Sequence, residues 1–273
     1  FCKRLYIGCR VIDIIFNFGD VILPTSKKQI YFFDWAYAVY EEDYIWEKML
    51  FNEWISRKIK IKIIKFYIGR VSLVIAQTKN IQERLKERYR IKKIIVIPTP
   101  IKINSDNFLI RNLFMHSNKI KLFYPASYAF HKNHNLLIET AELIKKRDLK
   151  FKFFVTIDSS RFMKQVLNKK LEPYIKNLGV LNSNEIDYAY KNCDAVIMPT
   201  LLETYGLPYY EAMAYQKPII SSYLDFAIDA CQDSAFYFNP FDSNDFLNAI
   251  EKTFSDEKSL SENIKNGYEI YSR

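Results

Sequence analysis

The chain alternates short apolar runs with longer amphipathic ones. The short runs are rich in Ile, Val and Phe, and we predict buried strands at 71–76, 94–97, 121–124, 151–157, 195–198 and 218–221. Apolar residues at helical spacing predict helices at 82–89, 135–146, 161–178, 186–191 and 208–215. Such alternation is typical of α/β proteins whose parallel sheets are covered on both faces.

The length of 273 residues fits two domains. A polar segment follows the strand that ends near Pro98, and a new strand opens near Lys121. We therefore predict a first lobe over 1–103, a linker over 104–118 and a second lobe over 119–258. Residues 259–273 are predicted to form a terminal helix.

Charge separates the two halves of the chain. Residues 1–118 hold 21 Lys and Arg against 11 Asp and Glu, a net of +10, whereas residues 119–273 carry a net of −1. We therefore expect the two halves to face different partners. No window is apolar enough to span a membrane, and the four cysteines (Cys2, Cys9, Cys193 and Cys231) lack zinc spacing. We expect a cytoplasmic protein without a metal site.

A basic segment at 54–70 holds six Lys and Arg and no acidic residue. Ile55, Ile59, Ile63 and Phe66 follow helical spacing within it. One interpretation is a helix that lies on an anionic membrane surface, which would make the protein peripheral at the cytoplasmic membrane. The other is an ordinary helix packed on its own lobe. No recognition motif accompanies the basic residues, so we predict no nucleic-acid binding.

The stretch 195–221, AVIMPTLLETYGLPYYEAMAYQKPIIS, predicts an anion-binding site. A strand ends near Pro199, and Pro208 marks the first turn of a helix, where a proline loses no hydrogen bond. Gly206 allows the backbone to approach a ligand closely. The exposed amides at a helix N-terminus bind phosphate.

Two carboxylates flank this predicted anion site. Glu203 precedes the helix, and Glu211 lies one turn inside it with its side chain directed back toward the helix start. Carboxylates accept hydrogen bonds from paired sugar hydroxyls, which fits a diphosphate between two sugars. Alternatively, Glu203 caps the helix and Glu211 is an exposed helical residue.

The whole pattern P-T-x-x-E-x-x-G-L-P-x-x-E-A-M-A followed by K-P-I-I resembles the signature of the group 1 (family 4) glycosyltransferases. These are retaining enzymes of GT-B fold. The resemblance extends over the second half, through KLFYPASYAFHKNHNLLIETAEL, NLGVLNSNEIDYAYKNCDAVIMPT and SAFYFNPFDSNDFLNAI, where Ser243 is predicted to cap a helix. It implies two Rossmann-like lobes with parallel sheets, and it implies that the C-terminal helix over 259–273 returns to the first lobe.

The resemblance also implies roles for individual residues. Glu203 would hold hydroxyls of the donor sugar, Glu211 would hold the ribose, and Lys132 would neutralise the departing diphosphate. The remaining donor-binding candidates are Gly206, Leu207, Thr204, Tyr205 and His131. Many relatives carry an arginine five residues before the lysine, a position that is Ser127 here. His134 is a further residue that could contact the sugar.

In the first half, QIYFFDWAYAVYEED resembles a strand and loop of the acceptor lobe, with Asp34 as a candidate for the cleft or a structural residue. VIAQTKNIQERLKERY followed by IIVIPTPI resembles the last strand, helix and strand of that lobe. The family's opening strand and Gly-rich loop have no counterpart, so we expect an incomplete first lobe and an N-terminally truncated chain.

The expected reaction moves a hexose from a nucleotide diphosphate-sugar to an acceptor hydroxyl with retention. The acceptor would be a surface glycan or a lipid-linked one, and neither cofactor nor metal would be needed. A nucleotide-sugar 2-epimerase on the same fold and a non-catalytic fragment that binds nucleotide sugars remain alternatives. The last expectation is that residues 119–258 bind nucleotide diphosphate on their own.

Overall fold

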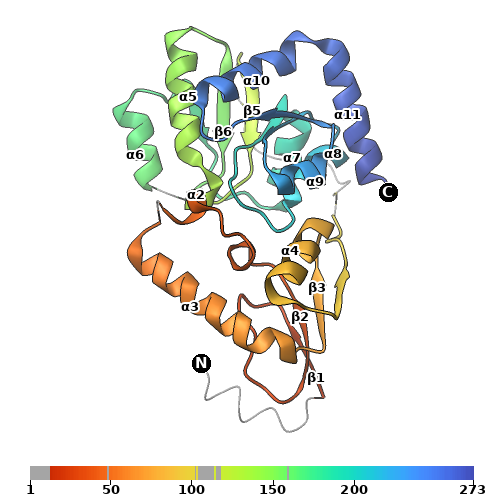
Figure 1. The fold of residues 1–273 in the computed structure, drawn as a ribbon. Helices are drawn as coiled ribbons and strands as arrows, with labels where there is room; N and C mark the ends of the chain where they lie inside the picture. Colours follow the sequence, from red (N-terminus) through yellow and green to blue (C-terminus); the bar gives the residue numbers. More distant parts are fainter. Residues whose placement is uncertain (1–12, 48, 102, 104–113, 115–117, 159) are drawn as a thin grey trace. The chain divides into compact units, whose positions relative to one another are not determined.

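The computed structural model describes residues 13–47, 49–101, 103, 114, 118–158 and 160–273, except the side chain of residue 161. These residues form two compact units (Figure 1). The first holds the residues up to Thr99 together with Leu202–Tyr205, and the second holds Pro100–Leu201 and Gly206–Arg273. Cys2, Cys9 and most of the predicted linker lie outside the described residues.

The first unit is built on a parallel sheet in the order β1-β2-β3-β4. Its strands are β1 (Ile14–Asn17), β2 (Lys28–Phe32), β3 (Leu73–Ala76) and β4 (Ile94–Val96). Its helices are α2 (Asp43–Trp46), α3 (Phe51–Tyr67) and α4 (Lys79–Tyr89), with short 3₁₀ turns at Ala36–Ala38 and Ile68–Arg70. The buried side chains of Tyr31, Val74 and Leu85 lie in the core of this unit.

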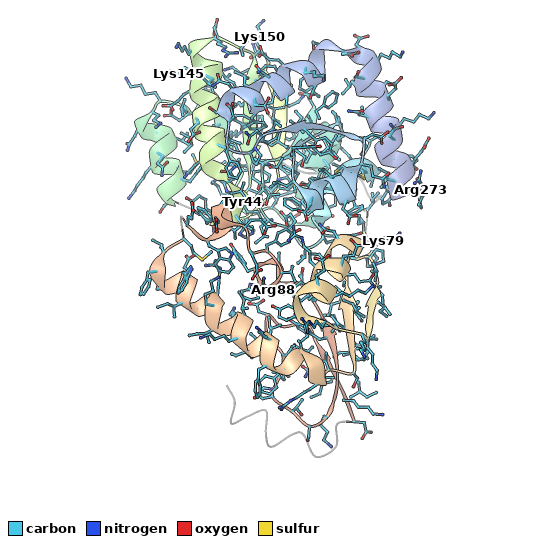
Figure 2. All side chains as sticks on the ribbon, in the orientation of Figure 1. Tyr44, Lys79, Arg88, Lys145, Lys150 and Arg273 are labelled. Atoms are coloured by element: carbon cyan, nitrogen blue, oxygen red, sulfur yellow. The ribbon has the colours of Figure 1, made fainter. Side chains whose placement is uncertain are left out.

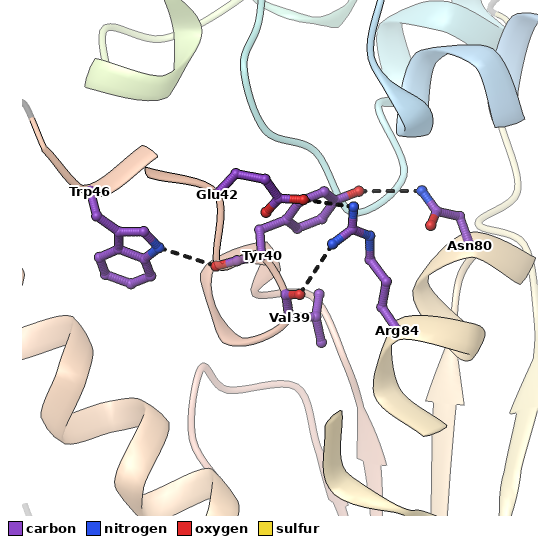
Figure 3. Close-up of polar contacts among 6 residues, drawn as sticks. All are labelled: Val39, Tyr40, Glu42, Trp46, Asn80 and Arg84. Atoms are coloured by element: carbon purple, nitrogen blue, oxygen red, sulfur yellow. Dashed lines mark hydrogen bonds and ion pairs between the residues drawn. The ribbon is translucent and has the colours of Figure 1, made fainter. Parts of the chain in front are cut away.

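The segment after β2 is fixed to α4 by polar contacts (Figure 3). Arg84 donates to the Glu42 carboxylate at 2.8 Å and lies 3.8 Å from the centroid of the Tyr40 ring. Asn80 donates to the Tyr40 hydroxyl at 3.3 Å, and the Trp46 indole donates to the Tyr40 carbonyl at 3.2 Å. Because Tyr40 and Trp46 are buried and hydrogen-bonded, the segment after β2 has a defined path.

The second unit is built on a parallel sheet in the order β10-β9-β8-β5-β6-β7. Its strands are β5 (Ile120–Tyr124), β6 (Phe151–Val155), β7 (Ile175–Asn177), β8 (Ala195–Met198), β9 (Ile219–Ser222) and β10 (Ala235–Phe238). The chain runs outward from β5 to β7, returns to pair β8 with β5, and then runs outward the other way. The strand order therefore reverses between β5 and β8, which makes this the switch point of the sheet.

Helices cover the second sheet, and side chains fill the space between the strands and the helices (Figure 2). The helices are α5 (His134–Lys146), α6 (Ser160–Asn168), α7 (Ser183–Asn192), α8 (Leu207–Ala214), α9 (Asp225–Cys231), α10 (Ser243–Ser255) and α11 (Glu257–Tyr271), with a 3₁₀ turn at Phe130–Lys132. Helix α5 packs on α10, and α11 packs on α8 and α10 (Figure 1). Cys193 and Cys231 are buried thiols.

Two sequence predictions about local structure were wrong. The helix predicted over 161–178 ends at Asn168, and Ile175–Asn177 forms strand β7. The chain leaves the helix because Lys170 takes a left-handed conformation (φ 53°) and Pro173 follows, which cannot continue a helix. Ser243 does not cap α10; Asp242 does, accepting from the amides of Asn244 and Asp245.

Helix α3 confirms the helical spacing predicted for the basic segment. Ile61 and Ile64 are buried on its inner face, while Ile55, Ile59 and Phe66 are exposed. Among the described residues, no helix has the length and apolar character needed to cross a membrane.

Candidate active site

The carboxyl ends of β5 and β8 lie next to each other in the second unit because these strands pair. The loop after β5 carries Ser127, His131 and Lys132, and the loop after β8 leads to α8. The backbone amide of Leu201 donates to the His131 carbonyl at 2.7 Å, and Thr200 Oγ1 donates to the same oxygen at 3.2 Å. In open α/β sheets, ligands bind at the carboxyl ends of the strands at this reversal point.

Lys132 ends a 3₁₀ turn whose backbone is anchored at several points. The Tyr124 hydroxyl donates to the Lys132 carbonyl at 2.9 Å. The next residue, Asn133, has a left-handed backbone (φ 54°), and its side chain donates to the Pro240 carbonyl at 2.9 Å. These bonds hold the loop that carries the Lys132 ammonium at the switch point.

His134 is a core residue in this structure. It is 2% exposed and packs among the rings of Tyr124, Tyr128 and Phe162. Burial, together with the nearby Lys132 charge, lowers the pKa of His134 to about 4. The imidazole is therefore neutral at pH 7. Because it is buried and packs against these three rings, it is not the sugar contact suggested by its sequence position.

The start of α8 has the features of an anion site. Gly206 precedes the helix with a left-handed backbone (φ 73°), and Pro208 lies in the first turn. The helix has no side-chain N-cap, so its first amides are not satisfied by a capping side chain. These amides and the helix dipole favour a negatively charged ligand beside Gly206 and Leu207.

Glu211 lies one turn into α8 and is half-buried. The Tyr190 hydroxyl of α7 donates to Glu211 Oε2 at 2.6 Å. Burial raises the pKa of Glu211, the Tyr190 hydrogen bond opposes this rise, and nearby Asp187 adds to it. The alternative of a fully exposed helical glutamate is therefore wrong.

The residues before Gly206 belong to the first unit. Thr204 Oγ1 donates to Asp34 Oδ1 at 2.6 Å, and the Tyr205 hydroxyl donates to the Thr99 carbonyl at 3.2 Å. Thr204 and Tyr205 are buried, and Glu203 is half-buried, close enough to raise the pKa of Tyr37 as one of several smaller influences after burial. Glu203 does not cap α8, since that helix has no side-chain cap.

Within the second unit, the structure thus brings Lys132 and His131 to the same end of the sheet as Gly206 and Leu207. Sequence reasoning missed Tyr190, because a buried tyrosine within a helical DYAY run has no motif of its own. Among the described residues, no three His, Cys, Asp or Glu side chains gather as a metal site would require.

Comparisons with known proteins support one family. A model described as "Glycosyl transferases group 1" matches residues 106–270, more than half of the chain. The alpha-monoglucosyldiacylglycerol synthase of Acholeplasma laidlawii is 24% identical over 82% of this chain and 60% of its own length. The chain thus spans about three fifths of the length of that curated relative.

Solved structures give the same fold. Sucrose-phosphate synthase from Thermosynechococcus elongatus superposes with a TM-score of 0.74 at 16% identity, over 91% of this chain and 64% of that one. Anabaena HepE, solved with UDP-glucose, gives 0.70 at 17% identity, over 90% and 68%. Both sheets are parallel, as the predicted α/β class requires. The chain belongs to the group 1 glycosyltransferases and has the GT-B fold.

Proposed function

We propose that the protein transfers a hexose from a nucleotide diphosphate-sugar to an acceptor hydroxyl with retention of configuration. The observation that supports this most is the uncapped start of α8 at the switch point, beside the loop of Lys132. A diphosphate needs both features: backbone amides that bind its oxygens and a cation that stabilises charge as it leaves. HepE, a protein of the same fold, was solved with UDP-glucose.

The proposed roles follow the charges of the site. Glu211, held by Tyr190, accepts hydrogen bonds from the ribose hydroxyls, and Glu203 accepts them from the donor sugar. Lys132 stabilises the negative charge that develops on the departing diphosphate. Retention then follows if that phosphate takes the acceptor proton on the face it leaves. Thr204, Tyr205 and His131 shape the loops, and Asp34 is a candidate on the acceptor side.

The test is a transfer assay with panels of UDP- and GDP-sugars and with diacylglycerol and glycan acceptors. Mass spectrometry identifies the product, and NMR of the anomeric proton identifies its configuration. Glu203→Gln should lower turnover about 100-fold with an unchanged melting temperature, because the residue acts on ligand. Glu83→Gln makes the same change on the exposed face of α4 and should leave turnover as it is. Nucleotide binding without transfer to any acceptor would favour the non-catalytic alternative.

The acceptor proposed here is lipid-linked and is reached at an anionic membrane surface. The relative from Acholeplasma laidlawii is named for a glucosylated diacylglycerol. In this chain, α3 exposes Ile55, Ile59 and Phe66 on the side opposite its buried Ile61 and Ile64, and Phe51 and Trp54 are exposed in its first turn. Lys62 lies within this row and Lys65 beside it, whereas the Lys58 ammonium lies over the Trp46 ring at 3.8 Å and Lys60 is turned toward Asp20 at 2.6 Å. An exposed apolar row flanked by cations fits a bilayer interface with anionic lipids.

A further inference from the structure

Helices α7 and α8 face each other through two acids and two tyrosines. On α7, Asp187 and Tyr190 are three residues apart; on α8 and its C-cap, Glu211 and Tyr215 are four apart, so each pair lies on one face. The tyrosine of each helix donates to the acid of the other helix. Tyr190 donates to Glu211 Oε2 at 2.6 Å, and Tyr215 donates to Asp187 Oδ1 at 2.6 Å.

The tyrosine rings hold this arrangement rigid. Tyr190 is fully buried, stacks on Tyr215 at 5.4 Å with 5° between the planes, and meets Phe123 of β5 edge-on at 5.4 Å. A ring fixed on two sides cannot swing, so its hydroxyl is directed at one point. That point is the Glu211 carboxylate.

The two carboxylates differ in burial and in the hydrogen bonding of their second oxygen. Asp187 Oδ2 is buried with no hydrogen-bond partner in the part of the chain that the structure describes. Glu211 is half-buried, and Tyr190 is the one described residue that bonds its carboxylate, through Oε2. Oε1 of Glu211 therefore remains available for a ligand.

We propose that Tyr190 is a positioning residue that fixes the Glu211 carboxylate for the two ribose hydroxyls of the donor, while Tyr215 and Asp187 hold α7 against α8. This inference rests on the proposed function, because it needs Glu211 to bind the ribose. It predicts that the Tyr190 hydroxyl matters only when the ligand carries ribose hydroxyls. A purely structural hydroxyl would affect every nucleotide alike.

The experiment uses calorimetry on the full chain with UDP and GDP, followed by the 2′,3′-dideoxy form of whichever binds more tightly. Tyr190→Phe keeps the stacked ring and removes only the hydroxyl. We expect it to weaken binding of the ribonucleotide about tenfold, the size of one hydrogen bond to a charged group, and to leave the dideoxynucleotide unchanged. Tyr215→Phe is the matched control. It should lower the melting temperature, and it should keep the ratio of the dissociation constants of the dideoxynucleotide and the ribonucleotide at the wild-type value.

Glu211→Gln separates the two possible failures. If it leaves the ratio of the two ligands unchanged, or if wild type binds neither UDP nor GDP, the proposed site fails and the positioning role fails with it. If Glu211→Gln lowers the ratio but Tyr190→Phe weakens both ligands equally, or neither, the site stands and the positioning role is wrong. A Tyr190→Phe protein that does not fold would assign the hydroxyl to the fold itself and would overturn the positioning role.

Discussion

Lys132 shows how a single charge can act at two stages of the proposed reaction. Its ammonium attracts the bound diphosphate, and it also stabilises the additional charge that appears when the sugar bond breaks. Only the second effect speeds the chemical step, because catalysis depends on interactions that strengthen in the transition state. The anchored backbone of the loop, through Tyr124 and Asn133, keeps the cation in place without a conformational cost.

We therefore predict that Lys132→Ala lowers turnover about 100-fold but changes binding of a free nucleoside by less than about twofold. The nucleoside lacks the phosphates that the ammonium would contact. Steady-state kinetics and calorimetry measure the two effects. Lys132→Arg keeps the charge and should recover part of the turnover. Equal losses of turnover and nucleoside binding in Lys132→Ala would limit the residue to ground-state binding.

His134 predicts a pH dependence of stability. Its pKa is lowered in the folded protein from 6.5 to about 4, so the unfolded chain takes up the proton first as pH falls. The stability that depends on a neutral imidazole is fully present above pH 6.5 and is lost as pH falls toward 4, by on the order of 3 kcal/mol. Urea unfolding of wild type and His134→Phe from pH 7.5 to 4.5 measures this difference. Parallel curves for the two proteins would show that the imidazole titrates normally.

At the scale of single residues, the sequence indicates which residue types could form the proposed site, but it does not show which neighbours hold each side chain. Glu211 was predicted from its spacing to Glu203, but its hydrogen bond to Tyr190 depends on the packing of α7 against α8. His134 illustrates the opposite error. Next to Lys132 it resembled a ligand contact, yet three aromatic rings distributed over residues 124–162 bury it.

Among the elements, helix boundaries depend on caps that a periodic pattern does not contain. The C-terminal limit of α6 follows from Lys170 in a left-handed conformation and from Pro173, signals that an apolar period extending to residue 178 obscured. The strand β7 that follows has three residues, too few for any period to identify it. By contrast, the sequence predicted the longer helices, α5 and α10, because burial imposes a helical period over several turns. It also predicted the strands β5, β6 and β8, because strands buried on both faces are continuous apolar runs.

The cap of α10 gives an element-scale prediction. Asp242 accepts from two of the first amides of the helix, whereas Ser243 is its first helical residue. Asp242→Ala should lower the free energy of unfolding by about 1 kcal/mol, and Ser243→Ala should change it by less than about 0.5 kcal/mol. Chemical denaturation of both variants measures the comparison. A larger loss for Ser243→Ala would return the cap to the position predicted from the sequence.

For the molecule as a whole, the alternation of strands and helices predicted the α/β class, and the resemblance in the second half predicted the GT-B fold; both are confirmed. The surface that the basic first half offers to a partner was harder to predict. Helical spacing on α3 allowed two interpretations. The structure supports the helix packed on its own lobe, and membrane binding stays a proposal. Ile61 and Ile64 pack inward, and a second apolar row faces outward. A single hydrophobic period cannot show which of two apolar rows becomes the buried one.

The outward row leads to a prediction for the intact protein: it should bind anionic vesicles, and bind them less well as salt is raised. Replacing Lys62 and Lys65 by Gln should weaken binding by about 2 kcal/mol, roughly 30-fold in partition coefficient, because each cation near the surface contributes about 1 kcal/mol. Lys92 and Lys93 replaced by Gln make the same change of charge at another exposed place in the first unit and should have a much smaller effect. Phe66→Ser should weaken binding at every salt concentration, since it removes apolar contact instead of charge. Sedimentation with phosphatidylglycerol vesicles measures all of these. If wild type stays in the supernatant at low salt, or if the two double variants lose affinity equally, α3 is not the membrane-binding face.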